Sequence, residues 1–114
     1  MPVTEGLKFD KGKPPISWIS RRANEQEAFV LAFGAEKYER WNWSKGMSWS
    51  RLLDAALRHL LAYADGENTD AESGLSHLAH ARCDIGMLLD YEVEHPELDD
   101  RRPRSIPDAT GNSK

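Results

Sequence analysis

Apolar residues recur at helical spacing in three segments of the chain, and stretches rich in Gly, Pro and polar residues separate them. The first segment runs from about Arg21 to Arg40, and its apolar positions are Ala28, Phe29, Ala32 and Phe33. The second begins near Trp49 and has a broad apolar face made of Leu52, Leu53, Ala56, Leu57, Leu60 and Leu61. The third ends before Pro96 and repeats Leu75, Leu78, Ile85, Leu88 and Leu89. This pattern predicts three amphipathic helices.

No stretch alternates apolar and polar residues over the length of a strand, so we expect an all-α fold. Ser48 or Ser50 can cap the start of the second helix, and Gly66 suits its end. Three helices joined by short turns indicate a small helical bundle. Their apolar faces are wider than three helices of one chain would bury, which predicts an oligomer.

The chain divides into three parts by composition. Residues 1–17 hold two glycines and the Pro14-Pro15 pair, which forbids a helix, so they are expected to form a basic N-terminal arm. Residues 18–95 contain the predicted helices and are expected to form the helical catalytic domain. Residues 96–114 are rich in proline and charge, which is typical of a flexible C-terminal tail. A length of 114 residues predicts a single domain.

The composition excludes several classes of protein. Hydrophobic residues make up 39% of the chain and charged residues 30%, which is not the composition of a disordered protein. No apolar run is long enough for a membrane span and no secretory signal is evident, so we expect a cytoplasmic protein without membrane contact. The net charge of -4 argues against direct DNA binding. The single cysteine, Cys83, is expected to be a small core residue and not a nucleophile.

Two glutamates follow the apolar stripe of the first predicted helix. The helical spacing beyond Phe33 next reaches Glu36 and then Glu39 or Arg40. Two inward-pointing acids one turn apart repel each other unless a cation lies between them, and carboxylate oxygens suit Mg²⁺ or Mn²⁺. The alternative is a helix end with solvated charges.

A second polar cluster is expected between the second and third helices. A short turn joins them, so they should run antiparallel, with positions whose numbers sum to about 138 side by side. Asp54 then faces Asp84, and Arg58 and His59 face His80. Buried like charges need a cation or a proton, and a buried histidine needs a partner, so this convergence favours a functional site. A surface ion pair is the alternative for Asp54 and Arg58.

Basic and aromatic residues complete the candidate chemistry. The basic side chains expected to bind phosphate are Lys11, Lys13, Lys37 and Arg58. Cations beside a carboxylate-bound divalent metal ion suit a polyphosphate, although solvated loop lysines are common. Trp18 and Trp43 are candidates for stacking on a nucleotide base, while packing is the default role of a tryptophan.

Four stretches carry a resemblance to a known family: FDKGKP at 9–14, FGAEKYERWNWSKGM at 33–47, WSRLLDAALRHLLAYADGE at 49–67 and ESGLSHLAHARCD at 72–84. They resemble the phage dATP/dGTP diphosphohydrolases, the MazZ-type branch of the MazG-like all-α nucleoside triphosphate pyrophosphohydrolases. The resemblance implies a dimer or tetramer that hydrolyses a purine deoxynucleoside triphosphate, dGTP or dATP, between the α and β phosphates to the monophosphate and pyrophosphate. It also implies that the dGMP produced is used for the 2-aminoadenine nucleotide of a phage in its infected host cell.

The resemblance further implies two or more Mg²⁺ or Mn²⁺ ions per active site, held by ExxE on one helix and ExxD on a following one. Glu36 and Glu39 match the first half, whereas Arg51 stands where a glutamate would precede Asp54. The metal ligands that we expect are Glu36, Glu39, Asp54, Asp84 and His80.

Such ions would lower the pKa of a bound water, whose proton Glu39 or His59 would accept, while Lys37 stabilises charge on the leaving group. Because few residues remain for the helices, we expect a neighbouring subunit to complete the site. Two other functions stay open, a housecleaning hydrolase for non-standard nucleotides and a non-catalytic helical module that assembles with a partner.

Overall fold

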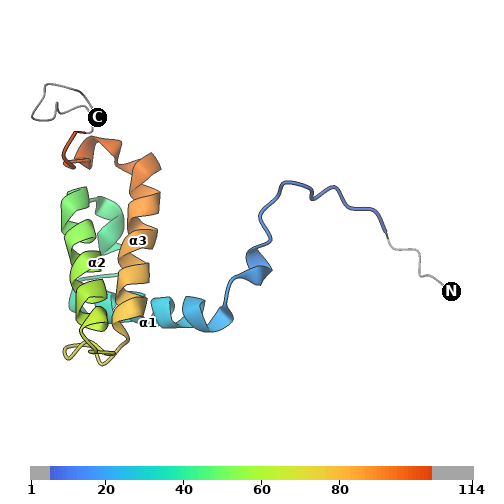
Figure 1. Cartoon of the computed structure of the whole chain (residues 1–114). Coiled ribbons are helices and arrows are strands. Elements are labelled where there is room, and N and C mark those ends of the chain that lie inside the picture. The colour runs from blue at the N-terminus through green and yellow to red at the C-terminus, as the bar shows by residue number, and fades with distance from the viewer. Residues whose placement is uncertain (1–5, 104–114) are drawn as a thin grey trace, which may run out of the picture.

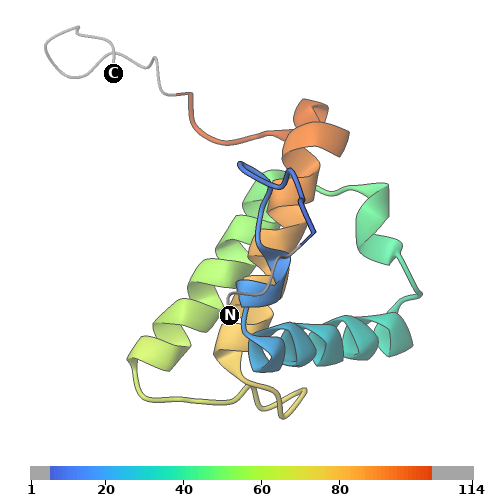
Figure 2. The same ribbon diagram turned by 90° about the vertical axis from the view of Figure 1, so that its right-hand side faces the viewer.

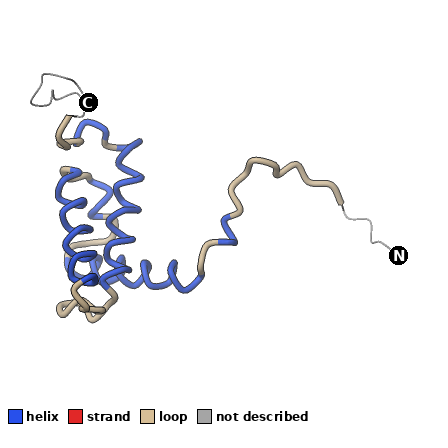
Figure 3. Tube along the Cα trace, in the orientation of Figure 1, coloured by secondary structure: helices blue, strands red, loops and turns tan. Residues whose placement is uncertain are grey.

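The computed structural model describes residues 6–103, which form α-helices and short 3-10 helices without a strand (Figures 1 and 3). The α-helices are α1 (Arg21–Lys37), α2 (Trp49–Ala64) and α3 (His77–Glu94). The 3-10 helices are η1 (Ile16–Trp18), η2 (Asn42–Lys45) and η3 (Pro96–Leu98). The predicted all-α fold is confirmed. Within the described residues, the helices are too short or too polar to cross a membrane.

Helices α2 and α3 lie side by side and antiparallel, and α1 crosses them near the turn that joins them (Figures 1 and 2). At the end away from the turn, Trp49 and Leu52 of α2 pack with Tyr91 of α3, which is fully buried. The Trp49 indole donates a hydrogen bond to the carbonyl of His95, at 3.0 Å. The α2–α3 hairpin is therefore the rigid part against which the other segments pack.

Helix α1 contacts α3 through a narrow strip centred on Val30, which packs on Ala79 and Cys83. Cys83 is 3% exposed, and burial raises the pKa of its thiol to about 12, as expected for the predicted core residue. Near the start of α1, Arg82 of α3 adds a polar contact, since its guanidinium donates a hydrogen bond to the Asn24 side chain at 2.7 Å. This docking positions the second half of α1 beside the α2–α3 turn.

The apolar stripe predicted for α1 is wrong in part. Ala28, Phe29 and Ala32 are exposed in this chain, whereas Val30 is buried and Phe33 half-buried. Successive residues of a helix point about 100° apart, so contact with α3 alone selects one narrow face. The stripe therefore does not lead into a buried position at Glu36, which is exposed.

Helix α1 also ends earlier than the predicted Arg40. Its last residue is Lys37, and the backbone of Tyr38 leaves the helical conformation. The carbonyl of Glu39 then accepts a hydrogen bond from Asn42 N, at 3.2 Å, in the turn that leads into η2. Glu36 and Glu39 therefore do not share a helical face.

The segment after α3 packs on the hairpin as far as the described residues extend. Leu98 joins the Trp49 cluster, and the guanidinium of Arg101 lies 4.8 Å from the Trp49 ring centre. Asp100 accepts hydrogen bonds from the backbone and hydroxyl of Ser50, at 2.9 and 2.5 Å. Residues 96–101 thus lie against the helical domain, whereas residues 104–114 of the expected tail fall outside the described residues.

The described part of the N-terminal arm extends away from the helices (Figure 1). Its apolar side chains are exposed, including Phe9 at 87% and Trp18 at 85%. Ser20 ends the arm by capping α1, because its hydroxyl accepts a hydrogen bond from Ala23 N at 3.1 Å.

Candidate functional site

Three histidines meet where the connection 65–76 joins α2 to α3. His59 extends from α2, and His77 and His80 from the first turn of α3. The Nδ1 atoms of His59 and His77 are 2.8 Å apart, and the rings of His59 and His80 stack with centres 4.5 Å apart. The prediction that His59 faces His80 is confirmed.

The connection 65–76 folds over the histidines and adds a carboxylate. The backbone of Asp70 is held by two hydrogen bonds, Asp70 N to Leu75 O at 2.8 Å and Gly74 N to Asp70 O at 2.7 Å. Ser73 N donates to Asp70 Oδ2 at 2.9 Å, and Ser73 Oγ lies 2.7 Å from His80 Nε2. His80 Nε2 is also 4.0 Å from Asp70 Oδ2. Asp70 and Ser73 are therefore part of the cluster.

Burial favours the neutral form of the His59 and His80 imidazoles. It lowers the pKa of His59, and the neighbouring His80 and His77 lower it further. Burial also lowers the pKa of His80, against the opposing effect of Asp70. Burial raises the pKa of Asp70, but hydrogen bonds from Ser73 outweigh it, so the net pKa of Asp70 is lowered. The ionised form of Asp70 and the neutral forms of His59 and His80, which offer lone pairs, are therefore favoured.

His77 has a buried nitrogen without a hydrogen bond. The residue is 5% exposed, and its Nε2 atom has no hydrogen-bond partner among the described residues. The nearest acid to that atom is Glu67, whose Oε2 lies 3.6 Å away. A buried polar atom without a partner is costly and points to a missing contact.

The end of α1 reaches the rim of this cluster. Phe33 contacts the His80 ring edge-on, with centres 6.4 Å apart. One turn later, Lys37 Nζ donates to Glu72 Oε1 of the connection at 2.9 Å, and this contact raises the pKa of Lys37. Lys37, His59 and His80, which the sequence pattern indicates separately, therefore gather around the same connection.

Asp84 lies further along α3 in a half-buried position. Burial raises its pKa to about 7, and the positive charge of Arg58 acts in the opposite direction. The charge of Arg58 therefore acts on Asp84, whereas the helical spacing predicts that Asp54 faces Asp84 and that Arg58 faces His80.

The other predicted metal ligands do not gather in a single chain. Glu36 and Asp54 are exposed, and Glu39 forms an ion pair with Lys45. Among residues 6–103, one group offers three metal-ligating atoms within 4.8 Å of one another, and it consists of His59, Asp70 and His77. The described residues of one chain therefore do not assemble the all-oxygen site that Mg²⁺ requires.

The residues predicted to bind phosphate and base are spread over the molecule. Lys11 and Lys13 are exposed in the arm, and Trp18 lies in η1 with 85% of its surface exposed. None of these described residues approaches the histidine cluster, because the arm extends away from the helices (Figure 1).

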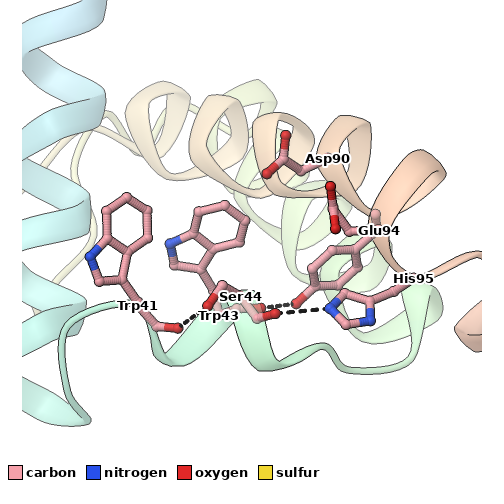
Figure 4. A pocket seen from close by; sticks show the side chains of 7 residues that line it. Trp41, Trp43, Ser44, Asp90, Glu94 and His95 are labelled. Carbon is pink, nitrogen blue, oxygen red and sulfur yellow. Dashed lines mark hydrogen bonds between the residues drawn. The ribbon is translucent and has the colours of Figure 1, made fainter.

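Trp43 lines a pocket of about 220 Å³ between η2 and the end of α3 (Figure 4). Its ring lies 6.0 Å from that of Trp41, centre to centre, and Asp90 and Glu94 line the same pocket. His95 closes one side through its Nε2 atom, 2.8 Å from the carbonyl of Ser44 (Figure 4). The pocket thus combines aromatic surfaces with carboxylates, near the end of the hairpin opposite the histidine cluster.

Sequence reasoning missed Asp70 and Ser73, which lie in a stretch that it interprets as a simple turn. A signal was present, because an Asp followed three residues later by Ser is typical of a turn in which the carboxylate accepts a backbone hydrogen bond. His77 and His80, which follow this turn in the sequence, strengthen that signal.

Comparison with known proteins identifies relatives. A family model described as dATP/dGTP diphosphohydrolase, N-terminal, matches residues 3–101. A protein of Salmonella phage PMBT28 named dATP/dGTP diphosphohydrolase is 44% identical over 97 residues, which cover 85% of this chain and 33% of that protein. The chain therefore spans about a third of the length of this relative. No solved structure matches the chain.

Proposed function

Because the chain belongs to the dATP/dGTP diphosphohydrolase family, within its N-terminal domain, we propose that it hydrolyses purine deoxynucleoside triphosphates. Water attacks the α-phosphorus, the bond to the bridging oxygen breaks, and the products are the deoxynucleoside monophosphate and pyrophosphate. The observation that carries the proposal is the family match over residues 3–101, which includes every residue of the histidine cluster.

The residues around the connection 65–76 suit this chemistry. His59 has a depressed pKa and a free lone pair at neutral pH, so it is our candidate for accepting the proton of the attacking water. Glu39 is the second candidate, once it is released from Lys45. Lys37 would exchange the carboxylate of Glu72 for a phosphate oxygen, and Arg58 would help to bind the same chain of phosphates.

We propose that the reaction depends on Mg²⁺ or Mn²⁺ bound through Glu36 and Glu39, with Asp54, Asp84 and His80 as the further ligands. When bound, such ions neutralise phosphate charge and lower the pKa of a water. The exposed positions of Glu36 and Asp54 favour an arrangement in which carboxylates from two copies converge, and hence a dimer or tetramer.

The arm and the aromatic pocket would bind the remainder of the nucleotide. Lys11 and Lys13 extend away from their own helices, which leaves them free to contribute to a site on a neighbouring copy. Trp43 is our candidate for stacking on the base, because it lines a pocket, and Trp18 is the second. We further propose dGTP as the substrate in a phage-infected cell, with dGMP as the precursor of the 2-aminoadenine nucleotide.

The test is chromatography of dGTP and dATP after incubation with the protein in Mg²⁺, in Mn²⁺ and in EDTA. We expect dGMP and pyrophosphate from dGTP with either metal and no turnover in EDTA. Release of inorganic phosphate, or no turnover of either nucleotide, would overturn the proposal. Faster turnover of damaged or non-standard triphosphates in the same assay would favour a housecleaning role.

A pair of matched variants tests the residues. Glu36→Ala is expected to lower kcat by about 100-fold or more, because loss of a metal-binding carboxylate weakens charge neutralisation. Glu25→Ala removes an exposed acid at the other end of the same helix, which pairs with Arg21, and should leave the activity unchanged. Equal activity of Glu36→Ala and Glu25→Ala would contradict the role of Glu36.

A further inference from the structure

The group His59, Asp70 and His77 differs in chemistry from the carboxylates considered above. It offers two imidazole nitrogens and one carboxylate oxygen within 4.8 Å of one another. Nitrogen-rich sets of this kind bind ions such as Zn²⁺, Co²⁺ and Ni²⁺ in preference to Mg²⁺, which requires oxygen ligands. The donor set therefore indicates a different ion from the one proposed for hydrolysis.

The distances in the group are close to those of a coordinated ion. The Nδ1 atoms of His59 and His77 are 2.8 Å apart. In a tetrahedral zinc site with Zn–N bonds of about 2.0–2.1 Å, two nitrogens lie about 3.3 Å apart. Small rotations of the two rings would open that space, so no backbone movement is needed.

The surroundings would hold the three ligands in place. A metal-bound imidazole donates its other N–H to an acceptor in most proteins, and His77 Nε2 has no hydrogen-bond partner but lies 3.6 Å from the carboxylate of Glu67. With the ion on Nδ1, the Nε2–H of His77 would donate to Glu67. Asp70 is oriented in the same way by the backbone N–H of Ser73. Glu67 and Ser73 thus lie where hydrogen-bond partners of a metal-bound His77 and Asp70 are required.

We propose that His59, Asp70 and His77 form a binding site for one ion of the Zn²⁺ class, which fastens the connection 65–76 to α2 and α3. Two imidazoles and one carboxylate leave one position of a tetrahedral ion open to water. The site is separate from the carboxylate ligands of the hydrolysis reaction. An imidazole that binds the ion has no lone pair left for a proton, so a chain with the ion bound would use Glu39, the second candidate, as the proton acceptor.

The test is direct binding of Zn²⁺ and Co²⁺ to the full chain after removal of metals with a chelator. Calorimetry is expected to show one Zn²⁺ per chain with micromolar or tighter affinity, and Co²⁺ is expected to give the visible absorption of a four- or five-coordinate ion. Thermal unfolding of the parent chain should shift upward with Zn²⁺, because an ion that binds the folded state stabilises it, and this shift should be lost in Asp70→Asn. Absence of saturable binding of both ions would overturn the proposal.

Variants assign the ligands. Asp70→Asn keeps an acceptor for Ser73 N and should weaken Zn²⁺ binding by at least about ten-fold, as should His59→Gln. His95→Gln removes a histidine that bonds Ser44, outside the group, and should bind Zn²⁺ like the parent chain. Circular dichroism establishes that each variant is folded. Unchanged Zn²⁺ binding by Asp70→Asn and His59→Gln, or an equal loss in His95→Gln, would overturn the assignment. Failure of the proposed hydrolysis is measured separately, by the chromatography of dGTP and dATP.

Discussion

His95 fastens the end of α3 to the connection between α1 and α2. Its Nε2 atom is 2.8 Å from the carbonyl of Ser44, and its Nδ1 atom is 3.3 Å from a carboxylate oxygen of Glu97. The hydrogen bond to Ser44 raises the pKa of His95, and Glu97 raises it further. The imidazolium form therefore stabilises the folded state more than the neutral form does.

We predict that His95→Gln loses more stability in acid than in base. The contribution of a histidine with a raised folded-state pKa is complete below the unfolded value of about 6.5, and it falls as the pH rises through the folded-state pKa. Urea unfolding at about pH 5.5 and about pH 8.5 measures the difference. Glu97→Gln, which removes the longer contact, should show the same trend with a smaller amplitude. A pH-independent loss in His95→Gln would refute the prediction.

At the residue scale, helical geometry alone predicts that His59 and His80 meet, because the spacing along two antiparallel helices determines which side chains face each other. It does not predict the position of Asp70, which depends on the backbone hydrogen bonds that fold the connection 65–76. It also predicts that Glu36 points inward, and this is wrong because α1 docks by a neighbouring face and leaves Glu36 exposed.

Among the elements, η2 depends on a glycine at its end. Gly46 has a φ of 94°, which disfavours residues with a side chain, and an added Cβ would lie 2.8 Å from Leu98 Cδ1 and 3.1 Å from the His95 ring. Gly46→Ala is therefore expected to lower the free energy of unfolding by about 1–3 kcal/mol. Chemical denaturation of the parent chain and of Gly46→Ala measures this difference in the free energy of unfolding.

A glycine in a helix provides the control for that prediction. A Cβ added to Gly34 in α1 would meet no atom within 4 Å outside its own helix, so Gly34→Ala should be neutral or stabilise the fold by about 0.5–1 kcal/mol. Similar losses in Gly46→Ala and Gly34→Ala would show that the close approach at Gly46 is not what limits substitution.

The N-terminus of α2 is capped by a residue near the C-terminal end of the described chain. Ser48 makes no side-chain cap, and Asp100 instead accepts from Ser50 N at 2.9 Å. Asp100→Ala should lower the midpoint of thermal unfolding by a few degrees, because a helix N-terminus loses its acceptor. Asp65→Ala, at the opposite end of α2, should not lower it, because an acid there opposes the helix dipole. No difference between the two variants would argue against the cap.

The extent of α2 follows from the sequence because its apolar face is broad and lies between Ser48 and Gly66, and the end of α3 follows because Pro96 forbids continuation. The start of α3 at His77 does not follow, since the predicted apolar repeat begins at Leu75. The end of α1 does not follow, since Tyr38 and Glu39 suit a helix and leave it only to form the turn before η2. The polar composition of residues 96–101 also does not predict that they pack on the helices. The contacts of Leu98 and Arg101 with Trp49 form only once the fold has positioned Trp49.

On the scale of the whole molecule, α2 and α3 each keep an apolar stripe outside the core. On α2, Leu57 is 48% and Leu61 64% exposed, and on α3 Leu89 is 62% exposed. Residues 54, 57 and 61 share one face of a helix, so the stripe on α2 runs directly into Asp54. A second copy that covers Leu57 and Leu61 would therefore lie beside a carboxylate that we expect to bind metal.

This geometry predicts that assembly and hydrolysis are coupled. Light scattering at micromolar concentration should give the mass of a dimer or tetramer, and Leu61→Glu should give a monomer that has also lost metal-dependent turnover, because burying a charge in an apolar contact is costly. Val93→Glu, at a 78% exposed position near the end of α3, adds the same charge at the opposite end of the hairpin from Leu61 and should keep both properties. A monomeric parent chain, or a monomeric Leu61→Glu variant with full activity, would separate the site from the assembly and place all its ligands within one chain.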